Sequence, residues 1–517
     1  MVEITGKDLT ILDLVEIAKR KKKIKISDNA RRQISSSYKK MLVLADSEEA
    51  IYGINTGFGV FSDKRISLKE SKKLNRNLIF SHAVGTGDPL PEEIVRAAMV
   101  VRINALAKGL SGVKPEIVYT LVEMVNKGVI PIIPSQGSLG SSGDLCLLAQ
   151  LGLVILRDEK DDDQESGKVI YENELLSGKD AMQRAGIGRI EFSHKDGLAL
   201  INGATFSAAI TALCVSKANK LLNIATEALG LSLEAMCGRS EAFDKEIQAA
   251  RNIDGQVEIA YDIRNIISGS SFIDSLDQIQ DAYSLRCAPQ VHGAIKETEN
   301  FVNRIISREI NAATDNPLLS NRDKFISGGN FHGEPVGMAA DFLSIAITEL
   351  GAISERRIFR LMDKNLNNGL PSMLVDSSEG EGVNSGIMIL QYTAAALALE
   401  NQTLAAPDSI KSLPTSANQE DHNANAFNAA INLWKIVINT TKILSIELYS
   451  ASRGIDLRKK IDPLGRLGIG TKKVYNLIRK EFPFYANDMQ WGLEMERFYQ
   501  LMLDNSDFKN NLFSILI

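Results

Sequence analysis

The sequence is poor in the residues that build disulfide frameworks, metal clusters and membrane spans. It has only four cysteines in 517 residues, Cys146, Cys214, Cys237 and Cys287, and no C-x-x-C pair. Scattered cysteines argue against a disulfide framework or a metal cluster and favour a reducing compartment, so we expect a cytoplasmic protein. No run of about 18 apolar residues lacks a charge or a breaker, so no membrane span is expected, and the polar N-terminus does not resemble a signal peptide.

An excess of positive charge is also absent. The chain has 59 basic and 64 acidic side chains, which gives a formal net charge of −5. This balance provides no broad attraction to nucleic acid or to an anionic membrane. Hydrophobic residues make up 44% and charged residues 24% of the chain, which is ordinary for a soluble globular protein.

The chain is rich in long apolar segments with helical spacing. They cover residues 197–237, 334–362, 384–403 and 424–452. Helices of this length and apolarity need partners on several sides, so the sequence predicts a mainly α fold with a long central helical bundle.

Strand signals are few and confined to the N-terminal part of the chain. The two candidates, 128–134 and 168–177, are short and bounded by proline or glycine. We therefore expect a smaller mixed N-terminal region, residues 1–190, followed by the long-helix bundle and a C-terminal helical region, residues 191–517.

The stretch "GSLGSSGD", residues 137–144, directly precedes the apolar run "LCLLAQLGLVIL". It lacks the Gly-Lys-Ser/Thr of a P-loop and the G-x-G-x-x-G of a dinucleotide loop. It also lacks the G-x-S-x-G spacing of a hydrolase elbow. Taken alone, the stretch predicts a loop with an N-cap for a helix that begins near Asp144.

A second interpretation of this stretch is chemical. In Ser141-Ser142-Gly143, the amide nitrogen of Gly143 can attack the carbonyl carbon of Ser141, and loss of water closes a five-membered ring. A second dehydration, across Cα–Cβ of Ser142, gives 4-methylideneimidazol-5-one (MIO), an electrophile made from backbone. Glycine is needed third because a side chain would hinder the tight turn. A helix N-terminus beside the ring would stabilise negative charge as a nucleophile adds.

Other segments contain residues that could take part in catalysis, although each alone favours a structural role. Tyr52 lies among three glycines in "YGINTGFG", and His82 is one of only five histidines. Asn202 precedes Gly203, which interrupts a long helical pattern at a cost of about 1 kcal/mol relative to alanine.

Two further segments contain charged or polar candidates. Gln280, Tyr283 and Arg286 have i, i+3, i+6 spacing, so if this segment is helical they fall roughly along one face. Glu400 lies at the end of an apolar run, where a surface position is the usual explanation.

Together these segments resemble the histidine/phenylalanine ammonia-lyase family. The ordered motifs are "YGINTGFG", "NLIFSHA", "GSLGSSGDL", "LALINGA", "QDAYSLRCAPQ", "TDNPL", "GGNFHGEP" and "SLPTSANQEDH". Asn55, the Ser81-His82 pair, "NFHGEP" and "SANQEDH" are most similar to the histidine branch. The resemblance implies a fumarase/aspartase-like helical architecture, although the "GSSxMPxKxN" segment of that related group is absent.

The resemblance implies non-oxidative elimination of ammonia from L-histidine to give trans-urocanate, the first step of histidine degradation. The β-proton is barely acidic and ammonia is a poor leaving group, so the reaction depends on MIO formed autocatalytically from Ser141, Ser142 and Gly143. Neither pyridoxal phosphate nor a nucleotide nor a metal is implied. The family is homotetrameric, with each site built from three chains, which would explain helices that are apolar all round.

The resemblance also implies a role for each candidate residue. The expected catalytic residues are Tyr52, Ser142, Tyr283 and Glu400, and the expected substrate-binding residues are His82, Asn202, Gln280, Arg286 and Phe331. Tyr52 is the expected base, with a pKa lowered from about 10 by electropositive surroundings. Arg286 would hold the substrate carboxylate in a bidentate fork, and Phe331 would pack near the ring.

His82 and Glu400 are the expected groups on the imidazole side. A neutral imidazole has one donor and one acceptor nitrogen, and a carboxylate accepts from the donor. A phenyl ring would leave both protein groups unpaired, which is a large selectivity term.

The chain departs from the family pattern in the ring triplet, at Leu147 and Gln150 shortly after it, and directly after "NQEDH". The first residue of the ring triplet is usually alanine and here is Ser141, a change that the chemistry tolerates but that can slow cyclisation. After "NQEDH" the usual Val-Ser-Met is Asn423-Ala424-Asn425, and in the family this segment borders the site.

Three alternatives stay open at this point. The first is an ammonia-lyase for tyrosine or phenylalanine, and the second is a 2,3-aminomutase acting on those substrates. The imidazole-side pair argues against both. The third is a helical pseudoenzyme whose triplet never cyclises, and Ser141 is its main support.

Overall fold

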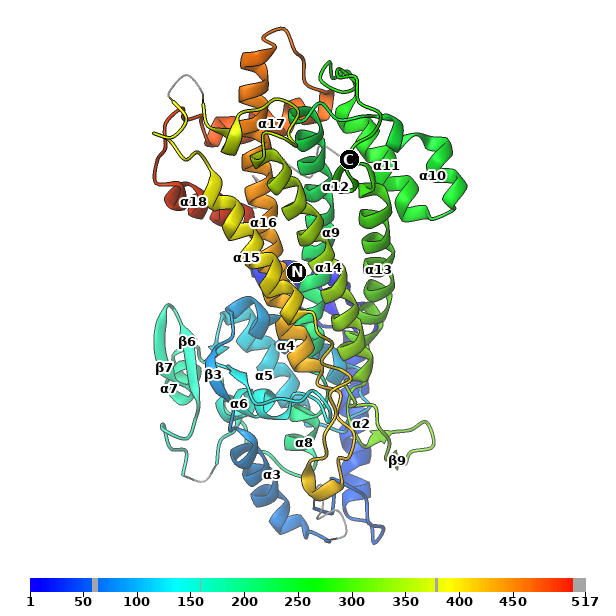
Figure 1. The fold of residues 1–517 in the computed structure, drawn as a ribbon. Helices are drawn as coiled ribbons and strands as arrows, with labels where there is room; N and C mark the ends of the chain where they lie inside the picture. Colours follow the sequence, from blue (N-terminus) through cyan, green and yellow to red (C-terminus); the bar gives the residue numbers. More distant parts are fainter. Residues whose placement is uncertain (58–63, 159, 377–379, 505–517) are drawn as a thin grey trace. The chain divides into compact units, whose positions relative to one another are not determined.

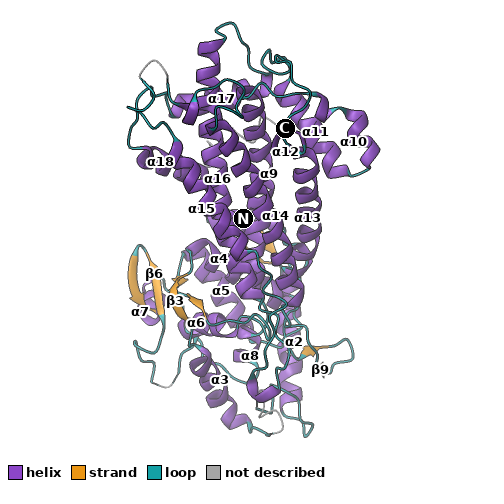
Figure 2. Cartoon of the chain, viewed as in Figure 1, coloured by secondary structure: helices purple, strands orange, loops and turns teal. Residues whose placement is uncertain are grey.

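The computed structural model describes residues 1–57, 64–158, 160–376 and 380–504. These residues form eighteen α-helices and only short strands. Figure 1 traces the chain, and Figure 2 shows that helices predominate over strands. The mainly α fold predicted from the sequence is therefore confirmed.

The chain divides into two compact units, each made from three separate segments. Unit 1 contains residues 1–216, 302–341 and 407–431, and unit 2 contains residues 217–301, 342–406 and 432–517. Four long helices include residues of both units: α9 (Thr205–Ala235), α13 (Ala288–Glu309), α14 (Glu334–Met362) and α16 (Ala426–Ile461). The single boundary near residue 190 suggested by the sequence stays a prediction.

Unit 1 contains the strands and the shorter helices of the N-terminal part. In chain order these are β1 (Val2–Ile4), α1 (Ile11–Arg20), β2 (Ile24–Ile26), α2 (Asp28–Ala45), α3 (Leu68–His82), β3 (Thr86–Pro89), α4 (Glu92–Ala107), α5 (Pro115–Lys127), β4 (Ile130–Pro131), β5 (Pro134–Gln136), α6 (Leu145–Ile155), β6 (Lys168–Tyr171), β7 (Glu174–Ser177), α7 (Gly178–Arg184), α8 (Asp196–Ile201), β8 (Leu318–Leu319), β9 (Phe325–Ile326) and the 3₁₀ turn η5 (Ser416–Asn418).

Several of these helices begin at side-chain caps that the sequence supplies. The Thr10 hydroxyl accepts from the amide of Asp13 at the start of α1. Ser67 and Glu70 form a reciprocal capping box at the start of α3. Each such cap satisfies an amide that has no partner within the helix.

The core of unit 1 is built around α4 and α6. Helix α4 is buried almost all round and packs against α1 and α5. Helix α6 packs against α3 and α8. The packing of α6 on α8 matters for function because α6 follows the Ser-Ser-Gly turn and α8 ends just before Asn202.

The strands make small sheets. β6 and β7 form an antiparallel hairpin in which Lys168 pairs with Ser177, and β4 pairs with β6. The predicted strand 168–177 is thus two strands, because Glu172 and Asn173 adopt positive φ and turn the chain. The remaining pairs are β1 with β2 in parallel, and β3 with β5 and β8 with β9 in antiparallel.

Unit 2 contains, besides its parts of the four long helices, mostly shorter helices. These are η2 (Glu241–Phe243), α10 (Lys245–Arg251), α11 (Asp254–Ile267), α12 (Tyr283–Arg286), η3 (Ser372–Leu374), α15 (Met388–Leu404), α17 (Ile469–Glu481) and α18 (Trp491–Asp504).

A buried ion pair joins the helices of unit 2. The fully buried guanidinium of Arg357 donates to both carboxylate oxygens of Glu447, at 2.5 and 2.8 Å. The hydroxyls of Ser232 and Ser354 donate to the same carboxylate at 2.8 and 2.6 Å. A third contact, from Arg357 Nη1 to the carbonyl of Ser284 at 3.3 Å, ties α12 to this network.

The long helices agree with the sequence periodicity except at one break. The predicted helices 334–362, 384–403 and 424–452 correspond to α14, α15 and α16. The predicted segment 197–237 is divided into α8 and α9, because Gly203 adopts a φ of +108°. Within the described residues, α14 alone is long and apolar enough by composition to cross a membrane, and most of its apolar stretch is buried inside the protein.

Candidate functional site

A cavity of about 1240 Å³ lies in unit 1. Its wall includes residues from the segments 50–57, 64–82, 141–145, 198–202, 316–332 and 416–422. Tyr52, His82, Ser142, Asn202 and Phe331 all line it. Five of the residues predicted from separate motifs thus share one cavity.

The Ser-Ser-Gly turn is held by backbone contacts to the break between α8 and α9. The Gly203 amide donates to the Ser142 carbonyl at 3.1 Å, and the Asp144 amide donates to the Gly203 carbonyl at 3.0 Å. Gly143 has a φ of +95°, and a Cβ built there would lie 2.1 Å from the carbonyl carbon of Gly203. Only glycine fits this position, so the fold itself requires glycine as the third residue of the triplet.

Asp144, which directly follows the turn, is fixed by hydrogen bonds to its side chain. Its buried carboxylate accepts from the Ser138 hydroxyl at 2.8 Å and from the amide and hydroxyl of Ser207, both at 2.9 Å. Asp144 occupies the N-cap position of α6, as the sequence predicts, but its side chain makes no bond to that helix. It bonds instead to the first turn of α9. Burial raises the pKa of the Asp144 carboxyl, and these hydrogen bonds partly offset the shift.

Tyr52 lies half-buried on a loop fixed by Asn55. The Asn55 side chain accepts from the Ile51 amide at 2.7 Å and donates to the Glu49 carbonyl at 2.9 Å. These bonds close the turn that presents Tyr52 to the cavity. The last two residues of the "YGINTGFG" motif, Phe58 and Gly59, lie outside the described residues.

Asn202 is buried at the break after α8. Its side-chain amide donates to the Asp315 carboxylate at 3.2 Å and to the Asn316 carbonyl at 3.3 Å, both within the "TDNPL" motif. Asp315 also forms a buried ion pair with Lys195. The Arg102 guanidinium donates to the backbone carbonyl of Asn202. Asn202 is therefore held in place by a dense polar network beneath the cavity wall.

His82 lines the cavity from the last turn of α3. Its Nδ1 atom lies 3.0 Å from the Ser81 hydroxyl. Burial lowers the pKa of His82, and a hydrogen bond that the ring donates to the Leu78 backbone carbonyl and the charge of Glu420 partly restore it. The imidazole is therefore expected to be neutral at neutral pH.

Glu420 is a cavity residue that the sequence reasoning missed. It lies in the "SANQEDH" motif, and it lines the same cavity as His82. The sequence contained one signal for Glu420: it lies inside a polar motif, whereas Glu400 lies at the end of an apolar helix. Glu400 lies in unit 2 on the exposed side of α15, accepts from the Asn439 side chain at 3.0 Å, and does not line this cavity.

Two histidines on the cavity wall were also not singled out. His332 and His422 stack with ring centroids 6.0 Å apart and an interplanar angle of 7°. His332 Nε2 lies 3.1 Å from the carbonyl oxygen of His422. The pair joins the "NFHGEP" and "SANQEDH" motifs, which are about ninety positions apart in the chain.

Gln280, Tyr283 and Arg286 belong to unit 2 and do not line the unit 1 cavity. The condition for a shared helix face is not met, because α12 begins only at Tyr283 and Gln280 precedes it in a loop. Tyr283 is 71% exposed, and the Arg286 guanidinium lies 4.7 Å from its ring centroid.

A Ser-Ser-Gly turn that requires glycine and shares one cavity with a tyrosine and a histidine, in a mainly helical fold, is the arrangement expected of a helical carbon–nitrogen lyase. The comparison with known proteins gives the same class. The chain belongs to the aromatic amino acid lyase family, whose model matches residues 9–480.

Individual relatives cover nearly the whole chain. A histidine ammonia-lyase from Caldanaerobacter subterraneus subsp. tengcongensis is 44% identical over 504 residues, which are 97% of this chain and 96% of that protein. The crystal structure of histidine ammonia-lyase from Trypanosoma cruzi is 35% identical with a TM-score of 0.88, and covers 99% of this chain and 95% of that one. A phenylalanine aminomutase from Pantoea agglomerans is 30% identical with a TM-score of 0.91, over 98% and 100% of the two chains.

Proposed function

We propose that the protein is a histidine ammonia-lyase that converts L-histidine to trans-urocanate and ammonia. The observation that supports this proposal most directly is the presence of His82 and Glu420 on the wall that also holds Tyr52 and Ser142. A neutral histidine and a carboxylate can pair with the two nitrogens of a substrate imidazole, whereas a phenyl ring would leave both unpaired. Two bacterial relatives that are 43–44% identical to this chain are named histidine ammonia-lyase, which agrees with this substrate.

The residues of the turn fit an MIO group formed from Ser141, Ser142 and Gly143. The positive φ of Gly143 and the absence of space for a Cβ there are what a tight cyclisation requires. Such a group would supply an electrophilic carbon that makes ammonia a better leaving group. Helix α6 begins at Leu145, directly after the turn, so its N-terminal amides favour negative charge beside it.

The other residues of the cavity bind, orient and remove a proton. We assign Tyr52 as the base for the β-proton and Phe331 as an apolar wall beside the turn. Asn202 would orient the substrate carboxylate or the ring of the prosthetic group. We assign to Glu420 the imidazole-side role that the sequence suggested for Glu400.

We further propose that the protein acts in the cytoplasm as a homotetramer, and that Gln280, Tyr283 and Arg286 reach the cavity from other copies. The high exposure of Tyr283 supports this, because a tyrosine and an arginine that act on substrate must be covered when they act. Arg286 would then hold the substrate carboxylate in a bidentate fork.

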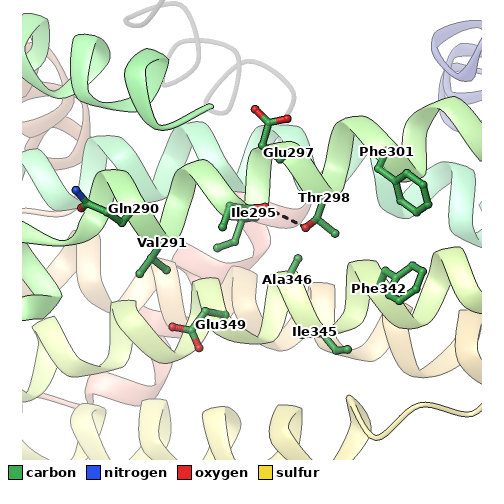
Figure 3. Close-up of a pocket in the computed structure, with 11 residues that line it drawn as sticks. Gln290, Val291, Ile295, Glu297, Thr298, Phe301, Phe342, Ile345, Ala346 and Glu349 are labelled. Carbon is green, nitrogen blue, oxygen red and sulfur yellow. Dashed lines mark hydrogen bonds between the residues drawn. The ribbon is translucent and has the colours of Figure 1, made fainter. Parts of the chain in front are cut away.

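An apolar groove in unit 2 supports the assembly. It has a volume of about 760 Å³ and lies between α13 and α14. Figure 3 shows Phe301 and Phe342 beside each other at one end of this groove, with ring centroids 5.9 Å apart. Ile345 is 49% exposed at its edge. An exposed apolar surface on helices of this kind is typical of a contact between subunits.

Two measurements test the proposed function. Intact mass spectrometry should show a chain lighter by two waters than its sequence, and Ser142→Ala should abolish both this loss and the activity. Incubation with histidine, phenylalanine and tyrosine separately, followed by product absorbance, should give urocanate alone. Cinnamate or coumarate without urocanate, a β-amino acid product, or an unmodified parent mass would each refute the proposal.

A further inference from the structure

We propose that Ser141 is a positioning residue that anchors one wall of the cavity to the prosthetic-group turn. This wall is formed by residues 412–425 (the 412–425 wall). This proposal rests on the proposed function for its catalytic consequence, but the anchoring itself is a structural property of the chain.

The anchor is one buried hydrogen bond between distant parts of unit 1. The backbone amide of Ala424 donates to the Ser141 hydroxyl at 3.0 Å, although the two residues are 283 positions apart. The Ser141 hydroxyl in turn lies 3.4 Å from the Leu139 carbonyl, to which it can donate. Ser141 is 5% exposed and Ala424 fully buried, so no water can replace the hydroxyl without a rearrangement.

The residues on either side of Ala424 close the wall on itself. The Asn423 amide donates to the Ser412 hydroxyl at 2.8 Å, and its side chain donates to the Leu413 carbonyl. The Asn425 side chain donates to the Asp408 carbonyl at 3.2 Å. Both side chains therefore fix the base of the loop, and Ser141 fixes the loop to the turn.

Two of the departures from the family pattern, Ser141 and the segment 423–425, thus meet at one point in space. Alanine at position 141 would leave the buried Ala424 amide without a partner, which is costly. Valine and methionine at positions 423 and 425 would remove both side-chain amides. Ser141 and the segment Asn423-Ala424-Asn425 therefore form one hydrogen-bonded unit in place of the residues that the family usually has at these positions.

The anchor acts on the side of the cavity that faces the imidazole. The 412–425 wall contributes Gln419, Glu420 and His422 to the cavity. The side chain of Ser141 takes no part in cyclisation, which uses only its carbonyl carbon. Loss of the hydroxyl should therefore loosen the binding of the imidazole without preventing formation of the prosthetic group.

Ser141→Ala is the variant that tests the anchor. We expect the loss of two waters to be retained, the KM for L-histidine to rise roughly tenfold and kcat to change much less, as for a loss of uniform binding. We also expect faster amide hydrogen exchange across the 412–425 wall, a readout independent of activity. Ser141→Thr keeps the hydroxyl and should restore both the KM and the exchange rates.

Ser166→Ala is a matched control. The buried Ser166 hydroxyl accepts from the Lys179 amide at 3.0 Å, so its loss also leaves a backbone amide without this partner, at a place that does not line the cavity. We expect this variant to leave the KM and the exchange of the 412–425 wall unchanged. If Ser141→Ala does not fold, Ser141→Cys, whose thiol accepts only weakly, should show the same changes at smaller size.

Unchanged exchange of the 412–425 wall in Ser141→Ala would overturn the anchor, as would equal effects in Ser166→Ala. Faster exchange with an unchanged KM would overturn the claim that the anchor positions the imidazole side. If the parent protein makes no urocanate, the proposed function fails, and the exchange measurement alone still decides whether Ser141 holds the wall.

Discussion

The pair of variants Glu420→Gln and Glu400→Gln decides which carboxylate recognises the substrate imidazole. Glutamine keeps the size of the side chain and removes its charge. Glu420 lines the cavity with His82, whereas Glu400 lies on the exposed side of α15 in unit 2. The two substitutions are chemically identical, so each is the control of the other.

The expected magnitude follows from the kind of bond that is lost. A hydrogen bond to a charged group contributes about 1.5–3 kcal/mol, and each 1.36 kcal/mol corresponds to about tenfold. Glu420→Gln should therefore lower kcat/KM for L-histidine by roughly 10- to 150-fold, and Glu400→Gln by less than about threefold.

A second consequence concerns the pKa of His82. The charge of Glu420 raises this pKa against the larger lowering caused by burial. Without that charge, the pKa of His82 should fall further below its ordinary value. The titration of the His82 ring signal by NMR in the parent and in Glu420→Gln measures this directly.

The assay is the rate of urocanate formation followed by absorbance over a range of histidine concentrations. A parental kcat/KM in Glu420→Gln together with a large loss in Glu400→Gln would refute the assignment, and it would show that the imidazole-side carboxylate comes from α15. Equal losses in both variants would refute the claim that the cavity of unit 1 contains the whole imidazole-side pair.

Three further predictions follow from buried groups. Gly203→Ala should lower the free energy of unfolding by at least about 2 kcal/mol and prevent the loss of two waters, because the new Cβ would lie 2.2 Å from the Thr314 carbonyl oxygen. A variant with the stability to urea and the mass of the parent protein would contradict this. Glu447→Leu should lower the free energy of unfolding by about 3–5 kcal/mol because it leaves Arg357 buried and unpaired, and the added substitution Arg357→Met should recover most of this loss. A double variant that is as unstable as Glu447→Leu in urea unfolding would contradict this. The pKa of His82, measured as the midpoint of its NMR titration, should lie below 6.5; the signal is assigned because it disappears in His82→Asn. His82 then stabilises the folded state above about pH 6.5, and this contribution is lost as the pH falls through the folded-state pKa. A pKa at or above 6.5 would contradict this.

Much of the fold could be predicted from local patterns. Helical spacing of apolar residues located α14, α15 and α16, because burial of one or more helix faces imposes that period along the chain. The same reasoning missed the division of residues 197–237, since it cannot show that Gly203 adopts a positive φ. It also left open whether Gln280 is helical, because spacing by three is compatible with a loop, and α12 begins only at Tyr283.

The sequence by itself determined the helical class and the ordered motifs, and it predicted the Ser-Ser-Gly chemistry, because each depends on residues close together in the chain. Only the tertiary structure decided which of those residues meet. Asp144 supports Ser207 across 63 positions, and Ser141 holds Ala424 across 283. Glu420 joins His82 on one cavity wall, where a sequence argument had chosen Glu400. Such pairings arise from the packing of helices distant in sequence, and no local period records them.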